Sequence, residues 1–294
     1  MKLLSFGEII WDVFGDNAAL GGAPLNFAAH AALQGCDAHL ASAVGDDGLG
    51  ARALEEIAAL GVGHELVSVV SDSPTGQCVV TLDGRGVPSY DILRNVAYDR
   101  IALPEHADGD FDVIAFGTLA LRDGHNRAEL ERFLSGSSFT EIYTDLNIRP
   151  PFYSRESIEL CLSSATIAKI SDEELPTVTE TLLGRRLEPA EAVRALSERY
   201  RQLKLLLITC GAEGAFCYDC ADGQTYTCPA SPATVVSTVG AGDSYGATFI
   251  VNYLKTGDVM HSMQLASRVS AFVVSNRGAI PEGTAEFIRT LVDD

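Results

Sequence analysis

The sequence predicts an α/β fold in which helices cover both faces of a mainly parallel central sheet. Segments with the pattern of buried strands alternate with helical segments along most of the chain. Strand segments such as 111–117 and 204–211 are rich in Ile, Leu and Val, as expected for a sheet that is buried on both faces. The chain has 294 residues, of which 47% are hydrophobic, and can bury a sizeable core. Because no repeat, low-complexity tract or linker interrupts it, we expect a single domain over residues 1–294.

The first sixty residues begin the alternation of strand and helix. Residues 2–14 have the pattern of a buried strand followed by a change of direction. Residues 21–35 predict a glycine turn that leads into an Ala-rich helix ended by Gly35. Residues 38–50 predict a strand and a turn, and residues 51–61 predict the next helix.

Between residues 73 and 98 the pattern changes. Two strand-like runs flank a turn cluster at 83–86, and no helix separates them. Such a hairpin either extends the edge of the main sheet or forms a small lid that stands off it. The residues alone leave both arrangements open.

After residue 110 the alternation of strands and helices resumes. The expected strands lie at 111–117, 141–147, 166–171 and 204–211, followed by a hairpin at 214–226. The expected helices lie at 126–133, after Tyr153 and at 189–200, and the last third contains a helix at 244–254 and two more helices.

Charge and cysteine usage restrict the classes of function. Acidic residues outnumber basic residues by 40 to 21, and a net charge of -19 repels nucleic acid and anionic lipid, so we expect neither a nucleic-acid nor a membrane partner. No apolar run is long enough to cross a bilayer, and seven cysteines, an odd number, indicate reduced thiols and a cytoplasmic location. Cys217 and Cys220, with Cys210 and Cys228 nearby, could hold a metal, but strand residues three apart face opposite sides, which favours buried thiols.

The segment STVGAGDSY at 237–245 is the strongest candidate site. Gly240 and Gly242 flank Ala241 and allow close approach of a ligand to the backbone, and the helix that follows offers unpaired N–H groups at the positive end of its dipole. We therefore predict an anion site, with Asp243 on the first helical turn. Helix capping would explain Asp243 in an isolated G-x-G-D, but a carboxylate beside an anion is unfavourable unless it has a role such as accepting a proton.

This segment resembles the C-terminal signature of the ribokinase-like, or phosphofructokinase-B type, family of carbohydrate kinases, and LGGAPLNFAAHAALQG at 20–35 resembles its N-terminal signature. Seven further segments match the family in order: GEIIWD at 7–12, AVGDDGLG at 43–50, PTG at 74–76, DLNIR at 145–149, AKISDEEL at 168–175, ITCGAEGAF at 208–216 and NRGAIP at 276–281. The resemblance covers essentially the whole chain. It implies a three-layer α/β/α sandwich, a small β lid formed by about residues 12–20 and 73–98, and a kinase that uses ATP and Mg²⁺.

The resemblance also implies roles for matching residues. Asp243 would take the proton from a primary sugar hydroxyl, while the amides of Gly240, Ala241 and Gly242 stabilise charge on the transferred group. The implied sugar site consists of Asp12, Gly21, Gly22, Asn26, Arg94, Asn147 and Arg149. The implied nucleotide site consists of Lys169, Glu174, Thr209, Gly211 and Gly214, with Glu174 holding Mg²⁺ through water. Without the motifs, Asn26 would read as a helix cap, Asp12 as a turn residue and Glu174 as part of a solvated helix face.

Two positions depart from the family pattern. Ser237 stands where the family usually has an Asp associated with a monovalent-cation site, which puts activation by K⁺ in doubt. Ser171 stands where an Asn commonly begins the motif that ends at Glu174, so the water network around magnesium is expected to differ.

Several substrates and two other classes of protein remain as alternatives. LGGAPLNFA, DLNIR and Arg94 resemble fructokinases, so fructose is our first choice, before 2-keto-3-deoxygluconate, whose carboxylate would need Arg94 or Arg149, and before a ribokinase activity. A catalytically silent sugar-binding regulator would be expected to lose the Asp of GAGD, which is intact. A nucleotide-binding oxidoreductase would need a dinucleotide fingerprint that residues 7–15 lack. An exposed lid hairpin could pair with a second copy to form a homodimer.

Overall fold

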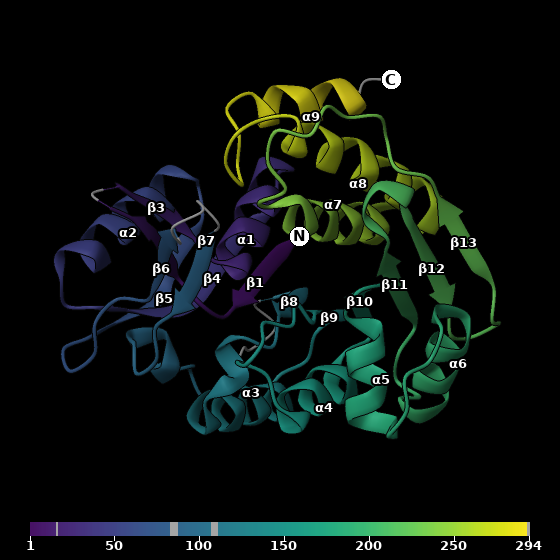
Figure 1. Cartoon of the computed structure of the whole chain (residues 1–294), viewed down its shortest axis with the longest axis horizontal. Coiled ribbons are helices and arrows are strands. Elements are labelled where there is room, and N and C mark those ends of the chain that lie inside the picture. Colours follow the sequence, from purple (N-terminus) through teal and green to yellow (C-terminus); the bar gives the residue numbers. More distant parts are fainter. Residues whose placement is uncertain (16, 83–87, 107–110, 293–294) are drawn as a thin grey trace.

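A nine-stranded sheet forms the centre of the computed structural model, which describes residues 1–15, 17–82, 88–106 and 111–292 (Figure 1). The strands follow the spatial order β13 (Thr225–Cys228), β12 (Ala215–Asp219), β11 (Leu205–Thr209), β10 (Ile167–Ser171), β9 (Glu141–Asp145), β8 (Val113–Phe116), β1 (Lys2–Phe6), β4 (Asp37–Gly45) and β5 (Gly63–Val70). All neighbours from β11 to β5 are parallel, and only β12 and β13 join this sheet antiparallel. The prediction of a mainly parallel sheet is confirmed.

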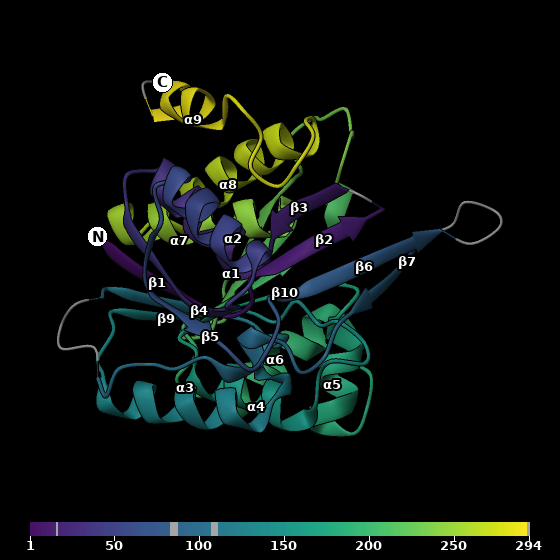
Figure 2. The ribbon, with the colours of Figure 1, turned by 90° about the vertical axis from the view of Figure 1, so that its left-hand side faces the viewer.

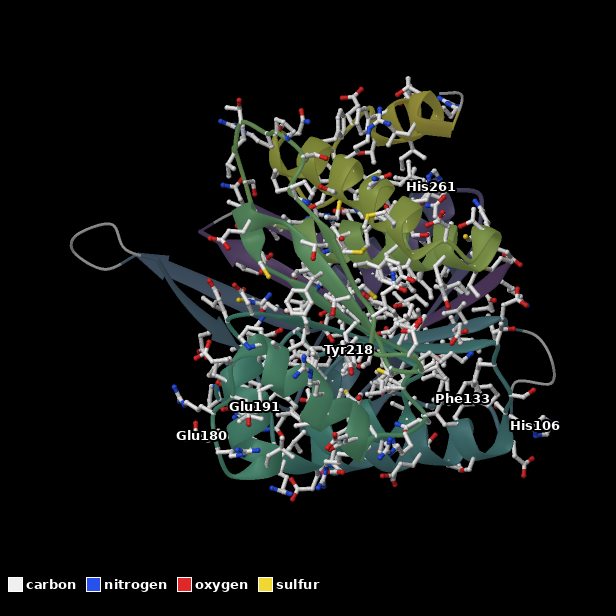
Figure 3. The ribbon with its side chains drawn as sticks, turned by 90° about the vertical axis from the view of Figure 1, so that its right-hand side faces the viewer. His106, Phe133, Glu180, Glu191, Tyr218 and His261 are labelled. Atoms are coloured by element: carbon white, nitrogen blue, oxygen red, sulfur yellow. The ribbon has the colours of Figure 1, made fainter. Side chains whose placement is uncertain are left out.

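Helices cover both faces of this sheet, as predicted (Figure 1). One face carries α1 (Ala23–Leu33), α2 (Gly48–Ala59), α7 (Ala241–Thr256) and α8 (Val259–Val274), with α9 (Thr284–Val292) packed outside α8. The other face carries α3 (Gly124–Gly136), α4 (Arg155–Ser164), α5 (Leu175–Leu183) and α6 (Pro189–Arg199). Figure 3, seen from the β12–β13 edge, has Phe133 of α3 and His261 of α8 on opposite sides of the sheet. None of the described helices is long and apolar enough to cross a membrane.

The apolar core is divided by the sheet into two clusters. Leu3 and Val113 belong to the cluster beneath α1 and α7, whereas their neighbours Leu4 and Ile114 belong to the cluster beneath α3 and α4. All four side chains are fully buried. Consecutive strand residues point to opposite faces, so a strand covered on both sides must be apolar at every position.

A separate four-stranded sheet contains β3 (Asn17–Gly21), β2 (Ile10–Phe14), β6 (Gln77–Leu82) and β7 (Pro88–Ile92), in that order. We call it the small sheet; it projects from the main body (Figure 2). The hairpin expected from residue 73 onward therefore joins β2 instead of extending the edge of the main sheet. Its expected turn at 83–86 lies outside the described residues.

Some elements differ from the sequence-based expectation. Residues 2–14 divide between the two sheets, because the chain leaves the main sheet after Phe6. Helix α3 is longer than the expected 126–133. Helix α5 was not expected, because LPTVTETLL is rich in β-branched residues of low helix propensity; burial of Leu175, Val178 and Leu182 stabilises it. Strand β5 at the edge was also missed.

Candidate functional site

The candidate site lies where the order of the main sheet reverses. From β1 the chain continues to β4 on one side, whereas β8 is followed by β9 on the other side. Ligands of open α/β sheets bind at such a point, outside the carboxyl ends of the strands. A narrow cavity of about 30 Å³ lies here, and its lining includes Glu8 after β1, Thr118 after β8, Asp145 at the end of β9 and Asp243 on α7.

The first turn of α7 offers a site for an anion. Its N-cap, Gly240, has a left-handed φ of 79°, and a Cβ there would lie 2.6 Å from the Cα of Ala279, so a larger residue would not fit. A Cβ on Gly242 would lie 3.1 Å from the Nζ of Lys169. The Ala241 amide makes a long bond of 3.3 Å to the Thr238 carbonyl. The start of a helix and an ammonium group therefore meet at one place, which suits a phosphate.

Asp243 lies on this turn and contacts α1. Its Oδ2 accepts a hydrogen bond of 2.8 Å from Nδ2 of Asn26. Desolvation raises the pKa of Asp243 to about 6; the hydrogen bond from Asn26 and the charges of Lys169 and Arg149 act against this shift, and the charge of Asp145 adds to it. At neutral pH this carboxylate is ionised and can still accept a proton.

Lys169 and Asp145 form a buried ion pair with an Nζ–Oδ2 distance of 2.6 Å. Burial lowers the pKa of Lys169, but Asp145, with smaller contributions from Glu174 and Asp243, outweighs it and raises the pKa above its ordinary value. The ammonium group therefore stays charged beside the turn. Sequence reasoning missed Asp145, although it begins the DLNIR motif at the carboxyl end of a strand.

Glu174 holds two backbone segments together. Its two oxygens accept hydrogen bonds from the amides of Ile148 and Ser171, and its own amide donates to the Ser171 hydroxyl. These bonds fix the segment that contains Asn147, whose φ of 41° is unusual for a residue other than glycine. Burial, and then the charge of Asp145, raises the pKa of Glu174. Its predicted role at magnesium stays a prediction.

Several residues predicted for the sugar come from β2, the end of β3 and the start of α1. Asp12 of β2 lies beside Gly21, where a Cβ would be 3.7 Å from its Oδ2. A Cβ on Gly22, which has a φ of 117°, would overlap the carbonyl oxygen of Glu8, so only glycine fits there. Desolvation raises the pKa of Asp12, while a hydrogen bond from the Cys78 thiol and the charge of Arg149 act in the opposite direction. Of the residues predicted for the sugar, Asn26 contacts Asp243 directly, and Asn147 lines the same cavity as Asp243.

The two predicted arginines occupy different positions. Arg149 ends the DLNIR segment, and its charge opposes the rise in the pKa values of Glu8, Asp12 and Asp243. Arg94 follows β7 in the small sheet, and its guanidinium lies over the ring of Phe152, 4.7 Å from the centroid. Arg149 thus interacts with the cluster of carboxyl groups around Asp243, whereas Arg94 packs at the base of the small sheet.

The predicted nucleotide residues lie at the carboxyl ends of neighbouring strands. Thr209 ends β11 and pairs with Ser171 of β10. Gly211 and Gly214, with φ of 53° and 106°, shape the turn that follows, and the carbonyl of Gly214 accepts a hydrogen bond of 2.8 Å from the Cys210 amide. This turn is next in line after Lys169 and Glu174 along the same edge of the sheet.

Glu8 is a second site residue that sequence reasoning did not identify. It is only 4% exposed and lines the same cavity as Asp243. Burial raises the pKa of Glu8 to about 7, although hydrogen bonds from the amides of Glu8 itself and of Ala23 lower it. The signal was present in the sequence, because Glu8 is a charged residue inside the most hydrophobic stretch of the N-terminal region.

Comparison with known proteins gives a consistent result. The family profile described as "pfkB family carbohydrate kinase" matches residues 3–285. The chain is 31% identical to a 2-dehydro-3-deoxygluconokinase of Thermoproteus tenax, over 88% of this chain and 80% of that protein. It is 26% identical to the probable fructokinase-4 of Arabidopsis thaliana, over 95% of this chain and 92% of that protein. A fructokinase of Xylella fastidiosa, solved with bound ATP, matches with a TM-score of 0.81 at 21% identity, and the match covers 99% of each chain. The predicted ribokinase-like fold is confirmed.

Proposed function

This chain belongs to the pfkB family of carbohydrate kinases, and from that premise we propose that it transfers the γ-phosphoryl group of ATP to a primary hydroxyl of a monosaccharide, with fructose as the first candidate. The observation that carries the proposal is the position of Asp243. Its carboxylate receives a hydrogen bond from Asn26 on the sugar side and lies on the helical turn that Lys169 approaches on the phosphate side.

In this mechanism Asp243 accepts the proton of the attacking hydroxyl. The hydrogen bond from Asn26 holds its Oδ2 in place, and Oδ1 is left to face the substrate. The amides of Gly240, Ala241 and Gly242 stabilise negative charge on the phosphoryl group as it moves. Lys169, held by Asp145, adds a fixed positive charge beside Gly242.

The residues present fit ATP and magnesium. A Cβ at Gly240 would overlap Ala279, and a Cβ at Gly242 would lie 3.1 Å from the Lys169 ammonium, so both positions favour glycine. Within the described part of the chain, no group of three His, Cys, Asp or Glu side chains is arranged to hold a metal. That suits Mg²⁺, which usually binds through phosphates, waters and one or two carboxylates; here Glu174 would hold it through water. When bound, Mg²⁺ supplies positive charge that neutralises the phosphate oxygens.

The charges around the sugar side favour a neutral sugar. Arg149 already interacts with Asp12 and Asp243, so a substrate carboxylate placed there would meet two competing carboxylates. We therefore put fructose first. The second candidate is 2-keto-3-deoxygluconate, which the 31% identity to the Thermoproteus tenax protein supports, and whose carboxylate would need Arg94 or Arg149.

The small sheet would act as a lid over the sugar within a single domain, and its edge strands β3 and β7 could also pair with a second copy. Excluding water in this way would favour transfer to the sugar over hydrolysis. We further propose that K⁺ is not required, because Ser237 replaces the usual Asp and its hydroxyl accepts a hydrogen bond from the Val239 amide. Equal rates in sodium and potassium buffers are expected, and a strong potassium requirement would show this to be wrong.

A phosphorylation screen tests the proposal. Release of ADP would be measured with fructose, 2-keto-3-deoxygluconate, ribose and adenosine as acceptors, in the presence of Mg²⁺. The highest kcat/KM is expected with fructose, and a product phosphorylated at the terminal hydroxyl. A preference for 2-keto-3-deoxygluconate would move the choice to the second candidate. A preference for adenosine, or no transfer to any sugar, would reject the proposal.

A further inference from the structure

Helix α1, which packs beside α7 (Figure 1), carries two buried polar side chains one turn apart. Asn26 donates to Asp243, and Nε2 of His30 lies 2.8 Å from the carbonyl oxygen of Ala279. Residues four apart share a face of a helix, so both contacts arise from the same side of α1. Asn26 is 6% exposed and His30 is fully buried.

Ala279 packs against the start of the phosphate-binding turn, which is the segment from Gly240 to Asp243. A Cβ on Gly240 would lie 2.6 Å from the Cα of Ala279 and 2.7 Å from its carbonyl oxygen, so the two backbones touch. Gly240 is the left-handed N-cap of α7. The Ala279 carbonyl therefore lies between His30 on one side and the start of the turn on the other.

The chemistry of this contact fixes the state of His30. A carbonyl oxygen can only accept, so Nε2 must carry the proton, and the tautomer follows from the partner. Burial lowers the pKa of His30, which keeps the ring neutral. Among the described residues, Nδ1 has no hydrogen-bond partner, so the bond to Ala279 is the polar contact that the ring makes.

We infer that His30 is a positioning residue for the phosphate-binding turn. The hydrogen bond from His30 fixes the Ala279 carbonyl, which lies against Gly240. Asn26, one helical turn earlier, donates a hydrogen bond to Asp243. One face of α1 thus fixes both ends of the turn that joins Gly240 to Asp243. The catalytic importance of His30 rests on the proposed function, in which this turn binds the transferred phosphoryl group.

Hydrogen exchange of the turn tests the inference without any turnover. The Ser244 amide donates to the Gly240 carbonyl at 2.9 Å and reports on the turn. In His30→Leu, which cannot donate to Ala279, this amide is expected to exchange about tenfold faster than in the wild type. His30→Gln, whose amide nitrogen can donate, should restore the wild-type rate.

Gln34→Leu is the matched control. Gln34 is the C-cap of α1, and its side chain donates to the His30 carbonyl and to the Thr248 hydroxyl, so it contacts the same helix without reaching the Ala279 carbonyl. Its replacement should leave exchange at Ser244 unchanged. Wild-type exchange in His30→Leu, or equal acceleration in all three variants, would overturn the inference.

Two measurements complete the test. Binding of a non-hydrolysable ATP analogue should weaken about tenfold in His30→Leu and recover in His30→Gln, while the KM for the sugar changes less than about twofold. If the wild type transfers phosphate to no sugar, the proposed function fails, and the exchange experiment still decides the role of His30. Should His30→Leu not fold, nitrogen NMR of the wild type decides it: a proton on Nε2 is expected, and a proton on Nδ1 would refute the contact with Ala279.

Discussion

Opposing effects set the pKa of Asp243, so that its carboxylate is ionised at neutral pH but can still accept a proton. Desolvation raises its pKa to about 6, and the hydrogen bond from Asn26 is the largest effect that opposes this rise. A general base is most effective when its pKa lies near the working pH. Activity should therefore fall as the pH drops through about 6, because the protonated carboxyl cannot accept the hydroxyl proton.

Replacing Asn26 should move this acid limb. Asn26→Leu removes the hydrogen bond that stabilises the ionised form, so the pKa of Asp243 should rise and the acid limb of kcat/KM should shift upward by about one pH unit. A pH–rate profile measures the shift. Asn126→Leu is the control, because Asn126 is an equally buried amide that bonds to the backbone at Tyr98, Ile101 and Ala120, away from the site. An unchanged acid limb in Asn26→Leu would show that Asn26 does not lower the pKa of Asp243.

Glu8 should make stability depend on pH. Its pKa is about 7 in the folded state against an ordinary value of 4.5, so the stabilising proton is present at low pH and is lost as the pH rises through about 7. The folded state should lose about 3 kcal/mol from this group between pH 4.5 and pH 8. Glu8→Gln carries no such proton, so chemical denaturation should show a smaller loss of stability over this range.

Glu141→Gln provides the comparison for Glu8. Glu141 is 5% exposed but is paired with Lys204, so its replacement should lower stability without removing the pH dependence assigned to Glu8. If Glu8→Gln and the wild type lose the same stability between pH 4.5 and pH 8, Glu8 does not hold a proton in the folded state.

The start of helix α7 depends on the absence of side chains. In Gly242→Ala the new methyl group would lie 3.1 Å from the Lys169 ammonium, which Asp145 already fixes at 2.6 Å, so one of these contacts must give way. We expect affinity for ATP, measured by calorimetry, to fall about tenfold, with the melting temperature little changed. Gly48→Ala is the control, since Gly48 also begins a helix but has nothing within 4 Å of its Cβ position. Unaltered ATP affinity in Gly242→Ala would contradict a phosphate at this turn.

Local patterns predicted the helical turn, whereas contacts between distant segments were beyond reach. Gly240 to Asp243 could be placed because a glycine turn and the helix after it are adjacent in sequence. The pairing within the small sheet could not be predicted, because β2 pairs with β6, more than sixty residues away, and pairing across such a distance leaves no local signal. Asp145 and Glu8 had local signals, a place in the DLNIR motif and a charge within a hydrophobic stretch, but the residues that they meet, Lys169 and Asp243, are distant in the sequence.

The molecule as a whole brings together three regions of the chain at one edge of the main sheet. Asn26 comes from the first tenth of the sequence, Asp145 and Lys169 from the middle and Asp243 from the last fifth. The net charge of -19 would by itself repel ATP, so the local group formed by the α7 amides and Lys169 must supply the attraction. In the proposed mechanism sugar and nucleotide would meet at Asp243, at the edge where the order of the strands reverses.

Asp243→Ala tests this arrangement most directly, with turnover measured by ADP release and the binding of ATP and fructose measured by calorimetry. If Asp243 is the base at the meeting point, kcat should fall between about 100-fold and 10,000-fold while both affinities stay within a few-fold of the wild type. A variant that keeps near wild-type kcat would contradict the assignment of the base and with it the proposed mechanism.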